Sequence, residues 1–200
     1  MKHAVIVAHP KARSFTASVA EAYIRACKEL GHTLVVRDLY HIGFDPCLKA
    51  AELPFEASFQ PGSDVVAERH LLKDCQAFAF FYPLWLNAPP AMIKGYLERV
   101  FGFGFAYGGE GRSYNPLLAG RQLISFSSSG APVDWLEHSG SLPAVRTLFD
   151  QYFAKLCGMT VLDHVHVGSV TPGASSYFVQ ARLDDVSKIV NRHFGRQACH

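Results

Sequence analysis

The chain has 200 residues, of which 18% are charged and 12% aromatic, and its formal net charge is +2. This length suits a single domain, residues 1–200, that can bury roughly 70% of the surface of the unfolded chain. The mixed charges form no basic stripe, so we expect no nucleic-acid partner. A predicted strand opens the sequence and no run of about 18 apolar residues follows, so we expect a soluble, cytoplasmic protein. Five cysteines without a C-x-x-C pair favour reduced thiols over a disulfide framework or a zinc site.

Apolar runs alternate with segments of helical period along the chain. The predicted strands are 3–8, 33–37, 77–82, 122–127 and 160–167, and the predicted helices are 15–30, 63–74, 90–101, 142–157 and 177–194. This alternation implies parallel strands joined by right-handed crossovers, and five such units predict a doubly wound five-stranded sheet with helices on both faces. Two further stretches, 40–61 and 102–120, are too long for tight turns, which is typical either of functional loops or of a flexible surface flap.

The loop after the strand at 77–82 is the most informative part of the sequence. Residues 77–81 are all apolar, as in a central parallel strand covered on both faces, so this loop lies at a carboxyl end of the sheet. Ligands of open α/β sheets bind at such ends, and Pro83, Leu84 and Trp85 offer flat apolar contacts to a ring system. A buried plug that fills a gap between layers is the alternative interpretation.

The loop after the first strand has the composition of a phosphate-binding site. It places His9, Lys11, Arg13, Ser14 and Thr16 at the start of a predicted helix. The free N–H groups and partial positive charge of a helix N-terminus attract anions, and hydroxyl groups add donors. Simple capping of the helix by Ser14 or Thr16 is the alternative, although it does not account for His9.

A run of small residues from Ser127 to Gly130 follows the strand at 122–127. Small side chains let backbone N–H groups approach a ligand closely, and donors placed there would stabilise the negative charge of a reduced flavin. An ordinary turn between strand and loop is the alternative. Three strand ends that carry loops of this kind together predict one ligand site at this edge of the sheet.

Several short motifs spread over nearly the whole chain form a specific set. They are Ala8-His9-Pro10, Ser14-Phe15, Asp38-Leu39-Tyr40, Phe44-Asp45-Pro46, Pro83-Leu84-Trp85, Pro90-Ala91, Lys94-Gly95, Glu98-Arg99-Val100-Phe101, Phe105-Ala106-Tyr107 and Cys157-Gly158. This set resembles the flavodoxin-like NAD(P)H:quinone oxidoreductase family of DT-diaphorase, modulator-of-drug-activity and potassium-efflux ancillary proteins. The resemblance implies a flavodoxin-like fold, a noncovalent flavin, and hydride transfer from NAD(P)H through that flavin to a quinone-like acceptor at a homodimer interface. FAD is favoured over FMN because the long loops could cover its adenosine half.

The resemblance also assigns roles to residues by their position in the motifs. The phosphate arm of the flavin would contact His9, Ser14, Phe15 and Thr16. The flavin ring would contact Pro83, Leu84, Trp85, Leu86 and Asn87. The polar edge of the ring would contact Ser127, Ser128, Ser129 and Gly130. Phe105 and Tyr107 would line the substrate side. The catalytic Tyr and His pair of the family falls on Trp135 and approximately Ser141, and His138 is the nearest imidazole, so Trp135 and His138 are the catalytic candidates. An indole can donate a hydrogen bond but cannot release a proton at neutral pH, so proton transfer departs from the family pattern.

Some features leave alternatives open. The departure at Trp135 also fits a slow flavin-binding regulatory subunit of a membrane transporter, and a nitro- or azo-reductase would differ only in its acceptor. His164 and His166 alternate along a strand and share one face, which suits ordinary hydrogen bonds better than a metal site that lacks a third ligand. Glu98 and Arg99 are interpreted as surface or interface charges. Motifs for a phosphate loop, a dinucleotide fingerprint or a serine elbow are absent from the sequence.

Overall fold

The computed structural model describes residues 1–54, 56, 58–109 and 114–195. Its central element is a five-stranded parallel sheet in the order β2-β1-β3-β6-β7. The strands are β1 (Lys2–Val7), β2 (Thr33–Asp38), β3 (Ala77–Pro83), β6 (Gln122–Ser128) and β7 (Thr160–Val167). The predicted doubly wound sheet is confirmed, with each predicted strand within one residue of its observed bounds.

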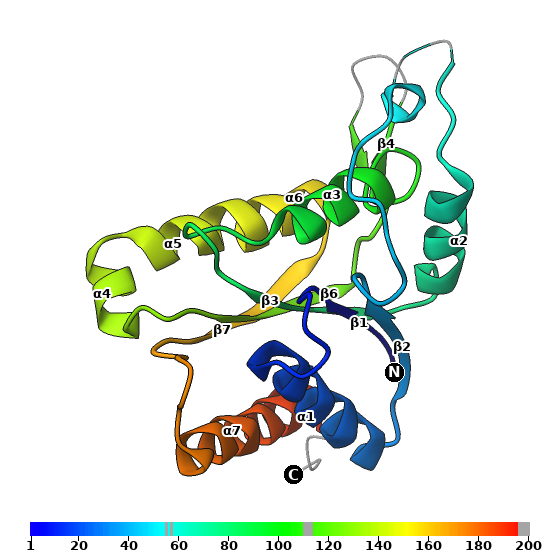
Figure 1. Cartoon of the computed structure of the whole chain (residues 1–200). Coiled ribbons are helices and arrows are strands. Elements are labelled where there is room, and N and C mark those ends of the chain that lie inside the picture. The colour runs from blue at the N-terminus through cyan, green and yellow to red at the C-terminus, as the bar shows by residue number, and fades with distance from the viewer. Residues whose placement is uncertain (55, 57, 110–113, 196–200) are drawn as a thin grey trace.

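Helices cover both faces of the sheet (Figure 1). One face carries α1 (Phe15–Glu29) and α7 (Ser176–Phe194). The other carries α2 (Ser63–Leu72), α3 (Ala91–Val100), α4 (Val133–His138), α5 (Ser141–Val145), the π-helical turn η2 (Arg146–Tyr152) and α6 (Phe153–Cys157). The helix predicted at 142–157 is therefore continuous but contains a π-helical turn, and α4 and the short 3₁₀ helix η1 (Ala50–Glu52) were not predicted.

The strand β3 separates two hydrophobic cores. Phe78 and Phe80 face the core under α3 and α6, while Ala79 and Phe81 face the core under α1 and α7. Successive side chains of a strand point to opposite faces, so a central strand between two helical layers needs apolar residues at every position. The unbroken apolar run in the sequence is explained by this double burial.

Buried charge holds the long segment between β2 and α2 against α3. The guanidinium of Arg99 donates to the Glu52 carboxylate at 2.8 and 2.7 Å and to the Asp64 carboxylate at 2.7 and 3.0 Å. Arg99 and Glu52 are both buried. The interpretation of Arg99 as a surface or interface charge is therefore wrong, because its side chain is an internal anchor. Glu98 is exposed and pairs with Lys94, as expected of a surface charge.

Two long segments that were predicted as loops pack together. The segment before α2 contacts α3 so closely that a Cβ atom on Gly95 would lie 2.1 Å from the carbonyl oxygen of Pro46. Further out, the rings of Phe59 and Phe103 meet edge-to-face with centroids 5.8 Å apart. In Figure 1 this segment and the hairpin of β4 (Tyr107–Gly108) and β5 (Asn115–Pro116) extend side by side away from the sheet. Residues 110–113 of the predicted loop at 102–120 lie outside the described residues.

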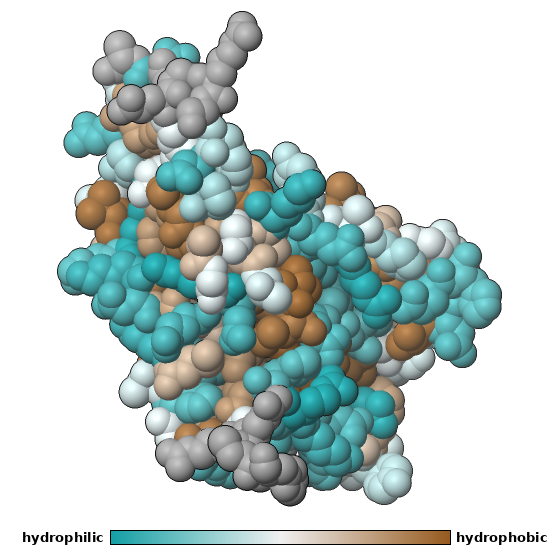
Figure 2. Space-filling view, turned by 180° about the vertical axis from the view of Figure 1, so that it is seen from behind, coloured by the Kyte–Doolittle hydropathy of each residue, from teal (hydrophilic) through white to brown (hydrophobic). Residues whose placement is uncertain are grey.

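The surface mixes polar and apolar residues. On the face shown in Figure 2, hydrophobic residues form separate patches among hydrophilic ones. A groove of about 210 Å³ between α3 and the helices η2 and α6 is bordered by the exposed side chains of Leu148 and Tyr152. Among the helices of the described residues, none has the length and apolar character needed to cross a bilayer.

Candidate functional site

A hollow of about 510 Å³ lies at the carboxyl edge of the sheet, a size within the roughly 300–1,000 Å³ typical of small-molecule sites. The loops after β1, β3 and β6 line it together, as the sequence predicts, and the loop after β7 forms a fourth wall that the sequence does not predict. The lining residues are His9, Pro10, Lys11, Arg13, Ser14, Phe15, Thr16, Pro83, Leu84, Trp85, Ser128, Ser129, Gly130, Val170, Thr171 and Pro172.

A smaller hollow of about 360 Å³ lies next to it, between the sheet, α1 and α7. Phe15, Thr16 and Ser128 line both cavities. The smaller cavity is bordered by core side chains of the sheet and by cations of α7 that form ion pairs, Arg182 and Lys188 with Asp185 and Arg192 with Asp163. The larger cavity instead places the exposed Lys11 and Arg13 beside a helix N-terminus, together with an exposed Trp and small residues. The larger cavity is therefore the better candidate for a polar, phosphate-bearing ligand.

The N-terminus of α1 gives one end of the larger hollow a positive potential. The Ser14 hydroxyl accepts a hydrogen bond from the Ala17 N–H at 3.1 Å, so the alternative of N-capping is realised, and the first turn contains no acidic residue. Lys11 and Arg13 are exposed beside the cap. Helix dipole and cations thus act in the same direction, and capping does not exclude anion binding at the remaining N–H groups.

His9 is held in the loop that precedes this helix. Its Nδ1 accepts a hydrogen bond from the Lys11 N–H at 3.0 Å, which leaves the proton of the neutral ring on Nε2 as a donor. The imidazole lies with its centroid 6.0 Å from that of the Trp85 ring. His9 therefore links the cationic end of the hollow with the loop that carries Trp85.

The loop after β3 contains a strained two-residue turn. Trp85 and Ala88 exchange backbone hydrogen bonds of 3.0 and 3.1 Å across a two-residue turn. In that turn Leu86 and Asn87 have φ of 51° and 56°. Asn adopts this left-handed conformation readily, but Leu does so at a cost of about 1–3 kcal/mol, and Leu86 is fully exposed. Strain of this kind concentrates at binding sites, and the turn holds the half-exposed Trp85 ring at the hollow.

Backbone hydrogen bonds join the other walls into one frame. The Leu84 N–H donates to the Ser128 carbonyl at 2.7 Å, and the Ser129 N–H donates to the Val167 carbonyl at 3.0 Å. The chain then passes so close to the next loop that a Cβ atom on Gly168 would lie 2.6 Å from the carbonyl oxygen of Ala131. These contacts fix three strand ends relative to one another before any ligand binds.

A buried row of hydrogen-bonded side chains runs beneath this frame. Asp150 of η2 accepts from Ser125 at 2.6 Å and from Nδ1 of His164 at 2.5 Å. Ser127 bonds both Nε2 of His164 and Nδ1 of His166, each at 2.7 Å, and Nε2 of His166 lies 3.0 Å from the hydroxyl oxygen of Ser129. His164 and His166 thus share one face of β7, as predicted, and their nitrogens are occupied by hydrogen bonds. Burial, with smaller contributions from the nearby His164 and Arg146, lowers the pKa of His166 to about 4, so its ring is neutral near pH 7.

The structure places other predicted residues outside the lining of the hollow. The side chain of Leu86 is fully exposed, and the Asn87 amide donates to the Ser141 carbonyl at 3.0 Å. Trp135 is 61% exposed on α4, and Nδ1 of His138, also exposed, bonds the Asp134 carbonyl at 2.6 Å.

The two predicted substrate-side residues lie at the protruding hairpin. The ring of Phe105 packs against Phe101 at 5.7 Å and under the guanidinium of Arg69 at 5.9 Å. Tyr107 meets Phe103 edge-to-face at 6.2 Å and borders the groove between α3 and α6. Neither residue lines the hollow of the same chain among the described residues.

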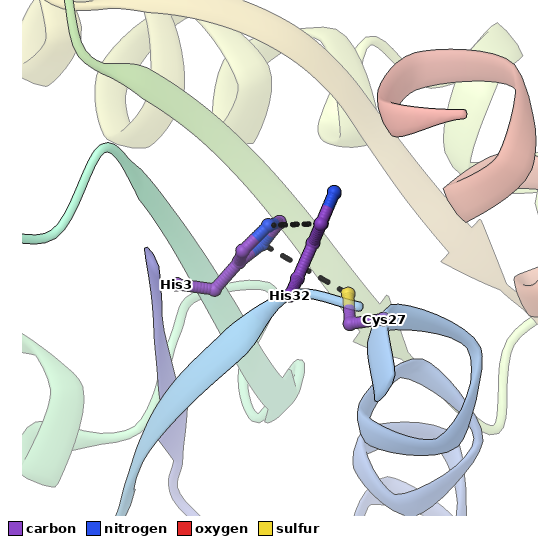
Figure 3. A group of neighbouring side chains, drawn as sticks. All are labelled: His3, Cys27 and His32. Atoms are coloured by element: carbon purple, nitrogen blue, oxygen red, sulfur yellow. Dashed lines mark hydrogen bonds between the residues drawn. The ribbon is translucent and has the colours of Figure 1, made fainter. Parts of the chain in front are cut away.

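A second polar cluster, His3, Cys27 and His32, lies at the opposite edge of the sheet (Figure 3). Nδ1 of His3 bonds the Tyr23 hydroxyl at 2.7 Å and its Nε2 bonds Nδ1 of His32 at 2.9 Å. Burial lowers the pKa of His3 to about 4 and raises the pKa of the Cys27 thiol to about 12. The group is therefore uncharged near neutral pH, and both nitrogens of its central imidazole have partners within the chain.

Comparison with known protein families matches residues 1–189 to the family described as having a flavodoxin-like fold. The chain belongs to this family. The flavodoxin-like protein is 34% identical over 171 residues to an uncharacterized NAD(P)H oxidoreductase of Haemophilus influenzae, with 85% of each chain covered. It is 27% identical over 187 residues to NAD(P)H dehydrogenase (quinone) 1 of Rattus norvegicus, covering 83% of this chain and 68% of the rat protein. The NAD(P)H:quinone oxidoreductase structure from Methanothermobacter marburgensis matches with a TM-score of 0.83 at 27% identity, over 100% of this chain and 98% of the other. The family resemblance drawn from the motifs is confirmed.

Proposed function

We propose that this flavodoxin-like protein is a flavin-dependent NAD(P)H reductase of quinones or similar flat acceptors. The observation that carries the proposal is the hollow itself, which has a cationic helix N-terminus at one end and an exposed Trp and small-residue loop at the other. A flavin nucleotide has the matching parts, a negative phosphate arm and a flat ring with a polar edge. The printed names of the relatives, NAD(P)H oxidoreductase and NAD(P)H dehydrogenase (quinone), support the same reaction class.

The residues of the hollow fit this cofactor. Ser14, Thr16 and the Nε2–H of His9 would hold its phosphate arm, with Phe15 beside them, and Trp85 with Pro83 and Leu84 would support its ring. Ser128, Ser129 and Gly130 of the lining would meet its polar edge, with the buried Ser127 directly before them and the N–H of Gly130 as a backbone donor. The turn at Leu86 and Asn87 would hold the Trp85 ring against the flavin. A bound flavin would supply hydride transfer between NAD(P)H and the acceptor. We favour FAD over FMN because the long segments beside the sheet offer surface for an adenosine half.

The acceptor side would be completed by a second copy of the chain. Tyr107 borders the apolar groove of about 210 Å³ next to the exposed Leu148 and Tyr152, and neighbouring Phe105 belongs to the same hairpin. Aromatic and apolar side chains of this kind are enriched at subunit interfaces. In a homodimer built on this groove, Phe105 and Tyr107 of one copy would face the acceptor in the other, and the exposed Trp135 and His138 would be the catalytic candidates at its rim.

A second function is favoured by one observation. Trp135, at the position where the family carries a proton-releasing Tyr, cannot release a proton, which suits a slow flavin-binding regulatory subunit of a membrane transporter. A nitro- or azo-reductase remains a variant of the first proposal with a different acceptor. Steady-state turnover no faster than that of free flavin, together with co-purification of a transporter, would select the regulatory role.

The decisive experiment is the visible spectrum of the purified protein, followed by mass analysis of the released cofactor. We expect a yellow protein that oxidises NAD(P)H when menadione is added. Replacement of both Lys11 and Arg13 by Gln should weaken flavin binding, while the same change at the exposed Lys28 and Arg25 of α1 should not. A colourless protein that neither FMN nor FAD can reconstitute would rule the proposal out.

A further inference from the structure

We propose that Asp150, His164, Ser127, His166 and Ser129 form a relay that stores one proton and exchanges it with the ligand bound in the hollow. The proposal deepens the proposed function and rests on it. The proposal is based on an unbroken row of four hydrogen bonds, 2.5 to 3.0 Å long. This row joins the buried carboxylate of Asp150 to Ser129, which lines the hollow. Distances of this kind permit proton transfer between neighbouring heavy atoms.

The row has a consistent direction when Asp150 is ionised. Nδ1–H of His164 then donates to Asp150, the Ser127 hydroxyl to Nε2 of His164, Nδ1–H of His166 to Ser127, and the Ser129 hydroxyl to Nε2 of His166. A proton received at the oxygen of Ser129 moves each of these protons one position along. The net result is one additional proton on the buried His164–Asp150 pair, with no change in the number of bonds to hydrogen at Ser127, His166 or Ser129.

The reverse transfer returns the proton to the hollow. The His164–Asp150 pair passes the additional proton to Ser127, every later hydrogen bond reverses, and the Ser129 hydroxyl becomes free to donate outward. The position of Ser129 suits both states, because its hydroxyl also lies 3.2 Å from the Ala131 carbonyl and so has an acceptor when His166 is the donor. Ser125 donates a hydrogen bond to the other carboxylate oxygen of Asp150 and is not part of the row along which the proton moves.

The proposed reaction requires such a proton. Reduction of a quinone to a hydroquinone by NAD(P)H consumes one hydride from the nucleotide and one proton, and the nucleotide leaves as NAD(P)⁺. In this chain Trp135 cannot supply that proton. The relay places one proton at Ser129, in the wall that would meet the polar edge of the flavin, and solvent recharges it between turnovers.

The surroundings keep the central imidazole neutral, which a relay needs because a permanently charged His would retain the proton. His166 is faced by His164 on its own strand, by Arg146 of η2 and by Glu137 of α4. Arg146 and Glu137 pair at 2.7 Å, so their charges largely compensate. On the other side Tyr82 of β3 lies 6.4 Å from the His164 ring, and burial raises its pKa, so that its hydroxyl stays protonated.

The π-helical turn explains how Asp150 reaches this position. Asp150 lies within η2 and its side chain is buried against β6 and β7. π-helical turns are rare insertions that redirect side chains and occur frequently at functional sites. A regular helix through 146–152 would shift the residues after the insertion around the axis, so the turn selects which side chain faces the sheet.

The test compares two buried hydroxyl groups of equal size. Ser127→Ala breaks the row at its centre, whereas Ser125→Ala removes a hydrogen bond to the same Asp150 and leaves the path intact; both serines are buried. In the full-length protein without added flavin, nitrogen NMR of the histidines should show His164 and His166 as neutral Nδ1–H tautomers. We expect Ser127→Ala to change the tautomer signals of both rings and Ser125→Ala to retain them.

With flavin bound, Ser127→Ala should lower kcat about 10²-fold, while flavin affinity and the KM for NAD(P)H keep their values. The solvent deuterium isotope effect on kcat should rise in Ser127→Ala and stay at its wild-type value in Ser125→Ala. Equal kcat and equal isotope effects in the two variants would overturn the relay, as would a loss of flavin affinity that accounts for the whole loss of activity. Wild-type protein that binds no flavin would instead refute the proposed function.

Discussion

Replacement of Arg99 by Met should destabilise the protein more than any comparable change of a surface arginine. The guanidinium is buried and donates four hydrogen bonds to the carboxylates of Glu52 and Asp64. Met fills a similar volume but leaves the buried Glu52 carboxylate without its cation. The perturbation therefore tests whether buried charge, rather than apolar contact, holds the segment before α2.

The structure gives the size of the effect. Hydrogen bonds from Arg99, with smaller contributions from the N–H groups of Lys49 and Gly62, lower the pKa of Glu52 from 4.5 to about 2 against the opposing effect of burial. A difference of this size in pKa corresponds to about 3 kcal/mol between the two protonation states. Asp64 is half-exposed, so its pair contributes little. A loss of about 3–5 kcal/mol is also typical of breaking a buried ion pair on one side.

The pH dependence provides a second measurement with a definite sign. Because the pKa of Glu52 is lower in the folded protein, the pair stabilises the fold above pH 4.5 and this contribution is lost as the pH falls toward 2. The gap between wild type and Arg99→Met should therefore be largest near pH 7 and shrink below pH 4.5.

Urea denaturation at several pH values measures this gap. Arg25→Met, at an exposed position of α1, is the matched control and should change the unfolding free energy by less than about 0.5 kcal/mol. A loss below about 1 kcal/mol for Arg99→Met at pH 7, or a gap that does not change with pH, would contradict the argument.

Three further predictions address the site and the fold. Trp85→Ala should weaken flavin binding about tenfold in a fluorescence titration, because it removes the ring that lines the hollow, while Tyr177→Ala at an 84% exposed position should leave binding unchanged. Gly95→Ala should lower the urea midpoint, since the new Cβ would lie 2.1 Å from the Pro46 carbonyl oxygen. This clash should destabilise the fold by about 1–3 kcal/mol, which outweighs the better helix propensity of Ala. A higher midpoint would disprove the close contact. Because burial lowers the pKa of His3 from 6.5 to about 4, the unfolded chain binds a proton there that the folded chain does not, so stability should fall by up to about 3 kcal/mol as the pH drops from 7 to 4. His3→Gln should remove this part of the acid sensitivity, and an unchanged slope in that variant would show that another group is responsible.

The sequence alone is sufficient for the sheet and for three walls of the hollow. The apolar run of β3 indicates that this strand is buried on both faces. Ser14 before an amphipathic segment indicates where α1 begins. These signals are local, because strand and helix periods and caps depend on residues only a few positions apart. Parallel connections then bring the loops after β1, β3 and β6 to one edge without further information.

Only the tertiary structure decided which polar side chains meet. Arg99 and Glu52 are 47 positions apart, and Ser127 lies 37 and 39 positions from the two histidines it joins, so no local period relates them. Helix period places Arg99 on α3 but does not show that the segment before α2 covers it. The fourth wall at Val170 to Pro172 likewise depends on how the end of β7 packs beside the loop after β6. The local sequence pattern determines which elements form and where their ends lie. The partners of buried charges depend instead on how distant elements pack. An unpaired polar group becomes costly only where packing excludes water, so this free energy cannot be read from neighbouring residues.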